Sequence, residues 1–198
     1  MATIISSDEI KKNLPDYSPQ KAEVFHQESA RIADKEFGQK IKGLEIDEIV
    51  IMSGGAASGK TEFLLTHLAN KKRCLIFDTT LSSEVGAKIK MSKILNLKKK
   101  PIVYAVIPDD LKRAFTAFLH RDRKFSDIHF YKTHSGSRKT LLWITKNFPK
   151  VEINIIESSF TNDQKMHFTK IEFYSKPKLI KYLQKLQLSE ADIISQVL

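Results

Sequence analysis

Short apolar runs alternate with amphipathic stretches along most of the chain. The run Ile49-Val50-Ile51-Met52 is continuously apolar and precedes a glycine-rich segment, which predicts a strand buried on both faces. Further strands are predicted at residues 74–77, 102–107, 151–156 and 168–173, with a polar turn near residues 161–163. Apolar positions at helical spacing predict helices near residues 61–69, 84–96, 109–119, 140–147 and 177–187. This alternation predicts an α/β fold with a doubly wound, mainly parallel sheet.

One amphipathic helix is predicted ahead of the first of these strands. Ser18 and Pro19 fit an N-cap and the first helical position, and the pattern ends near Gly43. The positions between them that recur at helical spacing are Ala22, Phe25, Ser29, Ile32, Ala33, Phe37 and Ile41. This stripe must pack on the region that follows. We therefore predict an N-terminal helical extension over residues 1–45, packed on a single globular domain over residues 46–198.

The glycine-rich segment after the first predicted strand matches a complete phosphate-binding motif. Gly54-Gly55-Ala56-Ala57-Ser58-Gly59-Lys60-Thr61 satisfies G-x-x-x-x-G-K-[ST], and we call it the phosphate loop. Its glycines let the backbone close around phosphate oxygens, to which successive N–H groups can donate. Lys60 should reach the β- and γ-phosphates of ATP or GTP, and the Thr61 hydroxyl should bind Mg²⁺. The motif predicts a P-loop NTPase fold.

The end of the second predicted strand places further polar groups beside this loop. Ligands of open parallel sheets bind outside the carboxyl ends of the strands, where Asp78 and Thr80 emerge. Asp78 could help to hold Mg²⁺ or accept the proton of an attacking hydroxyl, and Thr80 could contact the substrate. The alternative for Asp78 is a structural one, as the cap of the next turn.

Basic residues follow the helix predicted at residues 109–119. Arg121 and Arg123 could form a lid that neutralises charge on the transferred phosphoryl group; alternatively, they only stabilise a helix C-terminus. Residues 134–138 are predicted to form a polar turn, from which Arg138 could contact the second substrate and in which His134 is a bystander. Asp127 is the next candidate for a catalytic base after Asp78.

The charge and composition narrow the choice of ligands. The chain carries a net charge of +10, with 26 Lys/Arg against 13 Asp/Glu in residues 51–198. Such a field favours polyanions, whether nucleotides, nucleotide sugars or nucleic acid. No segment reaches the roughly 18 apolar residues of a membrane helix, and the first residues do not resemble a signal peptide. A cytoplasmic protein without a membrane segment is therefore expected.

Taken together, these segments resemble the zeta-toxin family of P-loop kinases. The resemblance rests on residues 25–34, the phosphate loop with its flanking residues, the strand end at residues 78–82, and Arg121 with Arg123. It implies an enzyme that uses ATP or GTP and Mg²⁺ to phosphorylate a sugar hydroxyl of a nucleotide sugar such as UDP-N-acetylglucosamine. It also implies that Lys60 and Thr61 hold the nucleotide and metal, and that the strand end contacts the substrate.

One departure from that family concerns its catalytic aspartate. Family members carry this residue in a segment between the phosphate-loop helix and the acidic-x-Thr strand end, whereas Lys60 and Asp78 are only 18 positions apart here (78 − 60). The segment is expected to be missing, and Asp78 would have to act as the base.

Three functions follow from these observations. The first is a small-molecule kinase, and the second is a polynucleotide 5′-hydroxyl kinase, which should bind oligonucleotides with strong salt dependence. The third is a catalytically degenerate nucleotide-binding module that pairs with an antitoxin-like protein. It should bind ATP or GTP without transferring phosphate to any acceptor.

Overall fold

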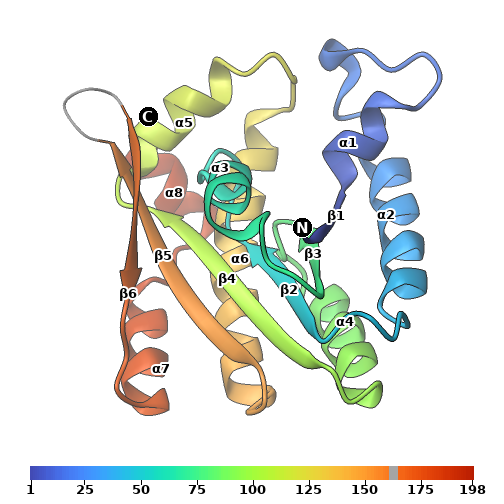
Figure 1. The fold of residues 1–198 in the computed structure, drawn as a ribbon. Coiled ribbons are helices and arrows are strands. Elements are labelled where there is room, and N and C mark those ends of the chain that lie inside the picture. Colours follow the sequence, from blue (N-terminus) through green and yellow to red (C-terminus); the bar gives the residue numbers. More distant parts are fainter. Residues whose placement is uncertain (161–164) are drawn as a thin grey trace.

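A six-stranded sheet forms the centre of the fold (Figure 1). The computed structural model describes residues 1–160 and 165–198, so the turn predicted near residues 161–163 lies outside the described residues. The strands are β1 (Thr3–Ser6), β2 (Glu48–Ser53), β3 (Cys74–Asp78), β4 (Lys100–Pro108), β5 (Glu152–Phe160) and β6 (Met166–Ile171). They lie in the order β1-β3-β2-β4-β5-β6, and every neighbouring pair is parallel except β5 with β6. The predicted α/β architecture with a mainly parallel sheet is confirmed.

Helices cover the two faces of this sheet because successive side chains of a strand point in opposite directions. Ile49 and Ile51 of β2 pack in one buried cluster and Val50 and Met52 in another. The helices are α1 (Ser7–Lys12), α2 (His26–Lys40), α3 (Lys60–Phe63), α4 (Glu84–Asn96), α5 (Leu111–Leu119), α6 (Asp127–Asn147), α7 (Lys176–Lys185) and α8 (Glu190–Val197). Side chains of α2, α4, α6 and α7 enter the first cluster, and Phe63 of α3 enters the second. None of these helices, in the part of the chain that the structure describes, is long and apolar enough to cross a membrane.

The parallel strands bring the polar residues that follow them to one edge of the sheet. Ser6 at the end of β1 lies opposite Asp78 at the end of β3, and Ser53 at the end of β2 lies opposite Ala105 of β4. The phosphate loop begins directly after Ser53. The segments after β1, β2 and β3 therefore meet, as a parallel sheet requires.

The N-terminal region differs from the predicted single helix. Residues 3–12 form β1 and α1, which were not predicted, and β1 joins the sheet beside β3. The helix expected from Ser18 begins only at His26, because Pro19–Lys21 forms a separate 3₁₀ turn. The four-residue β1 is too short for a clear alternation of apolar and polar positions, with only Ile5 fully buried. The division of the chain at residue 45 remains a prediction.

Helix α6 is much longer than the predicted helix at residues 140–147, and the predicted polar turn at residues 134–138 is wrong. That segment lies in the middle of α6. Several polar side chains on its buried face hide the apolar periodicity that marks a helix: Thr133, His134, Ser137, Arg138 and Thr140. The eight-residue α8 was also not predicted, and the helix expected at residues 61–69 is α3 followed by a π-helical turn, η2 (Leu64–Leu68).

Candidate functional site

Contacts within the protein fix the phosphate loop between β2 and α3. Gly59 has a φ of 84°, a left-handed conformation that glycine adopts without steric cost. The Gly54 N–H donates a hydrogen bond of 3.1 Å to the Thr80 carbonyl, and the Ser158 hydroxyl donates one of 2.9 Å to the Ser58 carbonyl. The loop is thus attached to the segment after β3 and to β5.

Lys60 points into the loop from the first turn of α3. Its side chain is only 9% exposed, and Nζ donates a hydrogen bond of 2.8 Å to the Gly55 carbonyl. Burial lowers the Lys60 pKa to about 8, although Asp78 opposes part of this effect. The ammonium is therefore poorly solvated, and an anion in the loop would stabilise it.

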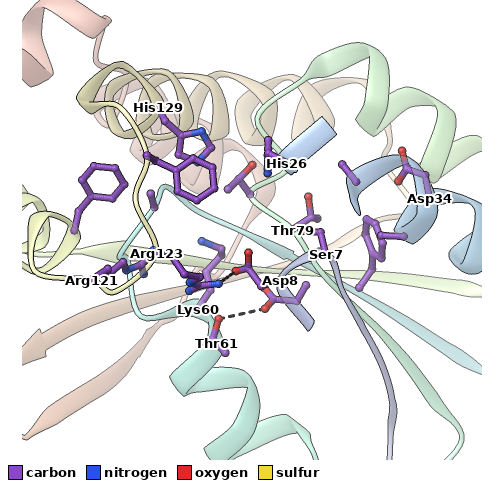
Figure 2. A pocket seen from close by; sticks show the side chains of 18 of the residues that line it. Ser7, Asp8, His26, Asp34, Lys60, Thr61, Thr79, Arg121, Arg123 and His129 are labelled. Atoms are coloured by element: carbon purple, nitrogen blue, oxygen red, sulfur yellow. Dashed lines mark hydrogen bonds and ion pairs between the residues drawn. The ribbon is translucent and has the colours of Figure 1, made fainter. Parts of the chain in front are cut away.

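Thr61 and Asp78 form a pair of oxygen donors next to Lys60. The Thr61 hydroxyl donates a hydrogen bond of 3.2 Å to Asp78 Oδ2 (Figure 2). Burial raises the pKa of Asp78, while Lys60 acts in the opposite direction. Hydroxyl and carboxylate oxygens are the ligands that Mg²⁺ prefers, so the pair fits the metal role predicted for it.

These groups open onto a cavity of about 190 Å³, which we call the inner cavity (Figure 2). The predicted site residues that line it are Ala56, Lys60, Thr61, Asp78, Thr80, Arg121 and Arg123. The loop residues Gly54, Gly55, Ala57, Ser58 and Gly59 are not part of its lining. Five aromatic rings also line the cavity: His26, Phe77, Phe118, Phe125 and His129. The inner cavity therefore combines a charged end at the phosphate loop with an aromatic wall.

Arg121 and Arg123 reach this cavity from the segment between α5 and α6. Arg123 forms an ion pair with Asp8 of α1 (Figure 2). Burial lowers the Arg121 pKa, and the neighbouring Arg123 lowers it further. A cavity of about 630 Å³, the outer cavity, shares Asp8, Thr61 and both arginines with the inner one. The arginines thus lie where the two cavities meet. This position is compatible with the lid that was predicted to cover the transferred group.

Asp8 lines both cavities and was not predicted from the sequence. It lies two residues after β1, whose end is opposite the end of β3, and it accepts a 3.1 Å hydrogen bond from buried Lys11. Burial raises the Asp8 pKa, but Arg123 and Lys11 outweigh it and hold the pKa below its usual value. The only signal in the sequence is a polar Ser-Ser-Asp after two isoleucines, which resembles the way in which Asp78 follows its apolar run.

Arg138 lines neither the inner cavity, which Lys60 lines, nor the outer cavity. Its guanidinium is buried inside α6, where Nη1 donates hydrogen bonds of 3.1 Å to His134 Nδ1 and to the His134 carbonyl. It lines a small pocket that also includes Gly54 and Gly55. Asp127 is an exposed residue at the start of α6 and lines neither cavity. The role of Arg138 in binding the second substrate remains a prediction that this position does not favour.

Three histidines around the site make the fold sensitive to acid. Burial lowers the pKa of His26, lowers that of His129 to about 4, and lowers that of His134 well below its usual value. Below pH ~6.5 these histidines are protonated in the unfolded chain but stay neutral in the folded protein. As the pH decreases, the free energy of unfolding should therefore fall by up to about 1.4 kcal/mol per pH unit for each histidine. Urea unfolding between pH 7.5 and 5 measures this slope.

His129→Gln should make that slope shallower, because the variant no longer has one of the three groups. The same change at exposed His167 is the control for the substitution itself. A free energy of unfolding that is constant from pH 7.5 to 5 would contradict the prediction.

Comparison with known proteins finds solved structures that this chain resembles. No protein-family model and no curated protein matches its sequence. A chain of the native AvrRxo1-ORF1:-ORF2 complex superimposes with a TM-score of 0.51 at 12% identity, covering 93% of this chain and 83% of that one. The complex with ATP gives 0.50 at 11% identity, with coverage of 89% and 80%, and the complex with sulphate ions gives 0.50 at 10%, with coverage of 79% and 74%. At these identities the likeness shows a shared fold, a mostly parallel α/β arrangement.

Proposed function

We propose that this protein is a kinase that transfers the γ-phosphoryl group of ATP or GTP to a hydroxyl of a nucleotide-like small molecule, such as a nucleotide sugar. One observation carries the proposal: Ala56, Lys60 and Thr61 of a complete phosphate loop line the same cavity as Asp8, Asp78 and two arginines. The zeta-toxin resemblance points to the same chemistry. A chain of similar fold has been solved in a complex with ATP, which supports a nucleotide as the ligand.

Thr61 and Asp78 would hold the Mg²⁺ that this chemistry needs. Their oxygens already lie 3.2 Å apart beside Lys60. Within residues 1–160 and 165–198, no three His, Cys, Asp or Glu side chains form a group that could bind a metal by themselves. This suits Mg²⁺, which usually takes one or two protein ligands together with phosphates and water. When bound, the ion would neutralise charge on the β- and γ-phosphates.

The pKa of Lys60 predicts a pH dependence of nucleotide affinity. The nucleotide polyphosphate favours the ammonium form, but above pH ~8 the free protein must first take up a proton. The Kd for ATP should therefore rise by up to about tenfold per pH unit above pH ~8. Isothermal calorimetry from pH 7 to 9.5, in buffers of different ionisation enthalpy, measures both the affinity and the proton uptake. A Kd that does not change up to pH 9.5 would contradict this role of Lys60.

Asp8 is the better candidate for the general base, and Asp78 for the metal. The Asp78 carboxylate already accepts a hydrogen bond from Thr61, and burial raises its pKa. Asp8 lines both the inner and the outer cavity, through which an acceptor would enter, and it is ionised at neutral pH because Arg123 and Lys11 hold its pKa low. In the proposed reaction the acceptor hydroxyl gives its proton to Asp8, its oxygen forms a bond to the γ-phosphorus, and the bond to the bridging oxygen of the leaving nucleoside diphosphate breaks. Lys60, Arg121 and Arg123 stabilise the charge on the transferred group.

Asp8 also changes the expectation that the base-containing segment is missing. The short connection between Lys60 and Asp78 leaves no room for such a segment after the phosphate loop. Strand β1, from the start of the chain, pairs with β3 and brings Asp8 to the end of the sheet where Asp78 lies. We infer that the N-terminal segment supplies the base that the family carries elsewhere in its sequence.

The aromatic wall of the inner cavity supports an acceptor that contains a flat ring. The Phe125 and His129 rings stack with centroids 4.3 Å apart, and His26 meets both rings edge-on at 5.5 and 5.2 Å. Base-aromatic stacking of this kind is tolerant of the base involved. The outer cavity adds space for the remainder of a nucleotide. This favours a nucleotide-like acceptor over a simple sugar or alcohol.

A second candidate function is a nucleotide-binding module that acts with a protein partner. The solved structures of similar fold are two-protein complexes, which supports a partner for this chain as well. Such a module would need the phosphate loop but neither Asp8 nor Arg123. The polynucleotide kinase predicted from the positive charge stays a third possibility, with oligonucleotides as acceptors.

One experiment separates these functions. The purified protein, Mg²⁺ and γ-labelled ATP are incubated with nucleotides, nucleotide sugars and 5′-hydroxyl oligonucleotides, with and without EDTA. We expect EDTA-sensitive labelling of a nucleotide-like small molecule. Tight binding of ATP with no labelled acceptor would favour the partner-dependent module. Labelling of oligonucleotides that falls steeply with salt would favour the polynucleotide kinase.

A further inference from the structure

Two consecutive residues of α6 hold both polar backbone groups of one residue in the phosphate loop. The Ala56 N–H donates a hydrogen bond of 3.0 Å to Thr133 Oγ1, and the Ala56 carbonyl accepts one of 2.8 Å from His134 Nε2. Thr133 in turn donates its hydroxyl hydrogen to the His129 carbonyl, 2.8 Å away. All of the contacts to Ala56 are buried. We call this arrangement the Ala56 clamp.

Arg138 determines which nitrogen of His134 carries the hydrogen. Its Nη1 donates to His134 Nδ1 at 3.1 Å, so Nδ1 must offer a lone pair and Nε2 must carry the proton that reaches Ala56. The His134 ring is fully buried, and a second proton on it would face the guanidinium. Burial, followed by Arg138, accordingly lowers the His134 pKa. The imidazole is a fixed, neutral donor.

The ring of His134 also lies so close to the loop that only glycine can occupy position 55. A Cβ on Gly55 would lie 2.2 Å from two His134 ring atoms, much closer than any real contact. The loop therefore rests directly on the imidazole. Gly55 allows this close approach, and the Gly55 carbonyl is the one to which Lys60 donates.

We propose that Thr133 and His134 are positioning residues that hold the phosphate loop in the shape that receives the nucleotide phosphates, and that Arg138 serves them by fixing the tautomer of His134. This deepens the proposed function and rests on it for the identity of the ligand. A loop that is already held needs no ordering when the phosphates bind, which favours affinity. Arg138 would thus act through the loop and make no contact with the second substrate.

Thr133 offers the cleanest test, because two near-isosteric changes separate its hydroxyl from its shape. Thr133→Val removes the acceptor of the Ala56 N–H, and Thr133→Ser keeps it. Loss of one such hydrogen bond should raise the Kd and KM for ATP by roughly 3- to 10-fold, while the KM for the acceptor stays unchanged. Thr133→Ser should remain close to wild type. The matched pair Thr116→Val and Thr116→Ser, at an exposed threonine of α5 that also bonds to its own helix, should change nothing.

His134 gives a second, independent pair of variants. His134→Leu should weaken ATP binding to a similar or greater extent, whereas His134→Gln, which can offer an N–H to the Ala56 carbonyl, should restore most of it. If either change at His134 raised the KM for ATP and the KM for the acceptor by the same factor, the proposal would be overturned, because a general loss of structure affects both constants. So would unchanged ATP affinity in folded Thr133→Val.

Amide hydrogen exchange tests the clamp without relying on catalysis. The Ala56 amide should exchange faster in Thr133→Val than in wild type or Thr133→Ser, while the Phe63 amide, which bonds to the Gly59 carbonyl, stays protected. Unchanged exchange at Ala56 would overturn the clamp. If the wild-type protein bound no ATP, the proposed function would fail, and this exchange measurement would still decide whether the clamp exists.

Discussion

Lys60→Met is expected to lower phosphoryl transfer by at least ~10²–10³-fold while the protein stays folded. Removal of one group that stabilises charge in a transition state typically costs this much, and Lys60 also contributes a charge-assisted contact to the bound phosphates. The fold should tolerate the change because, among the described residues, the Lys60 side chain makes a single hydrogen bond, to the Gly55 carbonyl. Three buried side chains hold the helical segment after the loop: Phe63, Leu64 and Leu68.

The stability of this variant has a predictable sign. Between pH ~8 and the usual lysine pKa of 10.5, the unfolded chain keeps a proton on Lys60 that the folded protein has released. Wild-type stability should therefore rise with pH over this range, and Lys60→Met should lose that rise. At neutral pH methionine removes a poorly solvated charge but also the ammonium that favours the Asp78 carboxylate, so the melting temperature should change little.

The measurement combines phosphoryl transfer, ATP affinity and thermal melting on the same preparations. Lys88→Met is the matched control, because Lys88 is an exposed residue of α4 and its loss should affect neither activity nor nucleotide binding. Transfer at the wild-type rate by folded Lys60→Met would remove the phosphate loop from the reaction and end the kinase assignment.

The sequence was sufficient for the central strands of the sheet because they are continuously apolar. Helix α4 occurs at its predicted residues, and β2, β3 and β4 lie within two residues of their predicted positions. The phosphate loop was predictable because its chemistry is local: eight consecutive residues carry the glycines, the cation and the hydroxyl. Asp78 and Thr80 followed from the same reasoning, since a strand end is visible in the sequence.

Other parts of the site depend on contacts between residues that are distant in the sequence. Asp8 enters the cavity because β1 pairs with β3, about 70 residues later, and no local pattern encodes that pairing. His134 and Arg138 were misassigned to a turn because α6 buries polar side chains against the loop. Burial of polar groups with partners removes the apolar stripe from which a helix is predicted. The sequence thus predicted the phosphate loop and the end of β3 better than the position of Asp8 and the extent of α6.

The two carboxylates near Lys60 have opposite environments, which suggests separate roles. The Asp78 pKa is raised by burial, and its carboxylate is engaged by Thr61. The Asp8 pKa is held low by Arg123 and Lys11 against the effect of burial. Enzymes commonly assign different tasks to paired acids through such differences. Substitution of each carboxylate by its amide should therefore produce two different kinetic defects.

Asp8→Asn should lower kcat by ~10²–10⁴-fold, the usual cost of losing a general base, with little change in ATP affinity. The amide also leaves the buried Lys11 ammonium without its partner, which should lower the melting temperature. The double variant Asp8→Asn with Lys11→Met removes both charges. It should recover stability and remain inactive, which separates the chemical role of Asp8 from its structural one.

Asp78→Asn should instead weaken the response to Mg²⁺, so that more metal is needed for half-maximal transfer. Asp16→Asn is the matched control for charge, because Asp16 is exposed and lines neither cavity. The decisive result is the transfer rate of the folded double variant at saturating ATP and Mg²⁺. A wild-type rate would exclude Asp8 as the base and return that role to Asp78, whose amide variant should then lose turnover at every Mg²⁺ concentration.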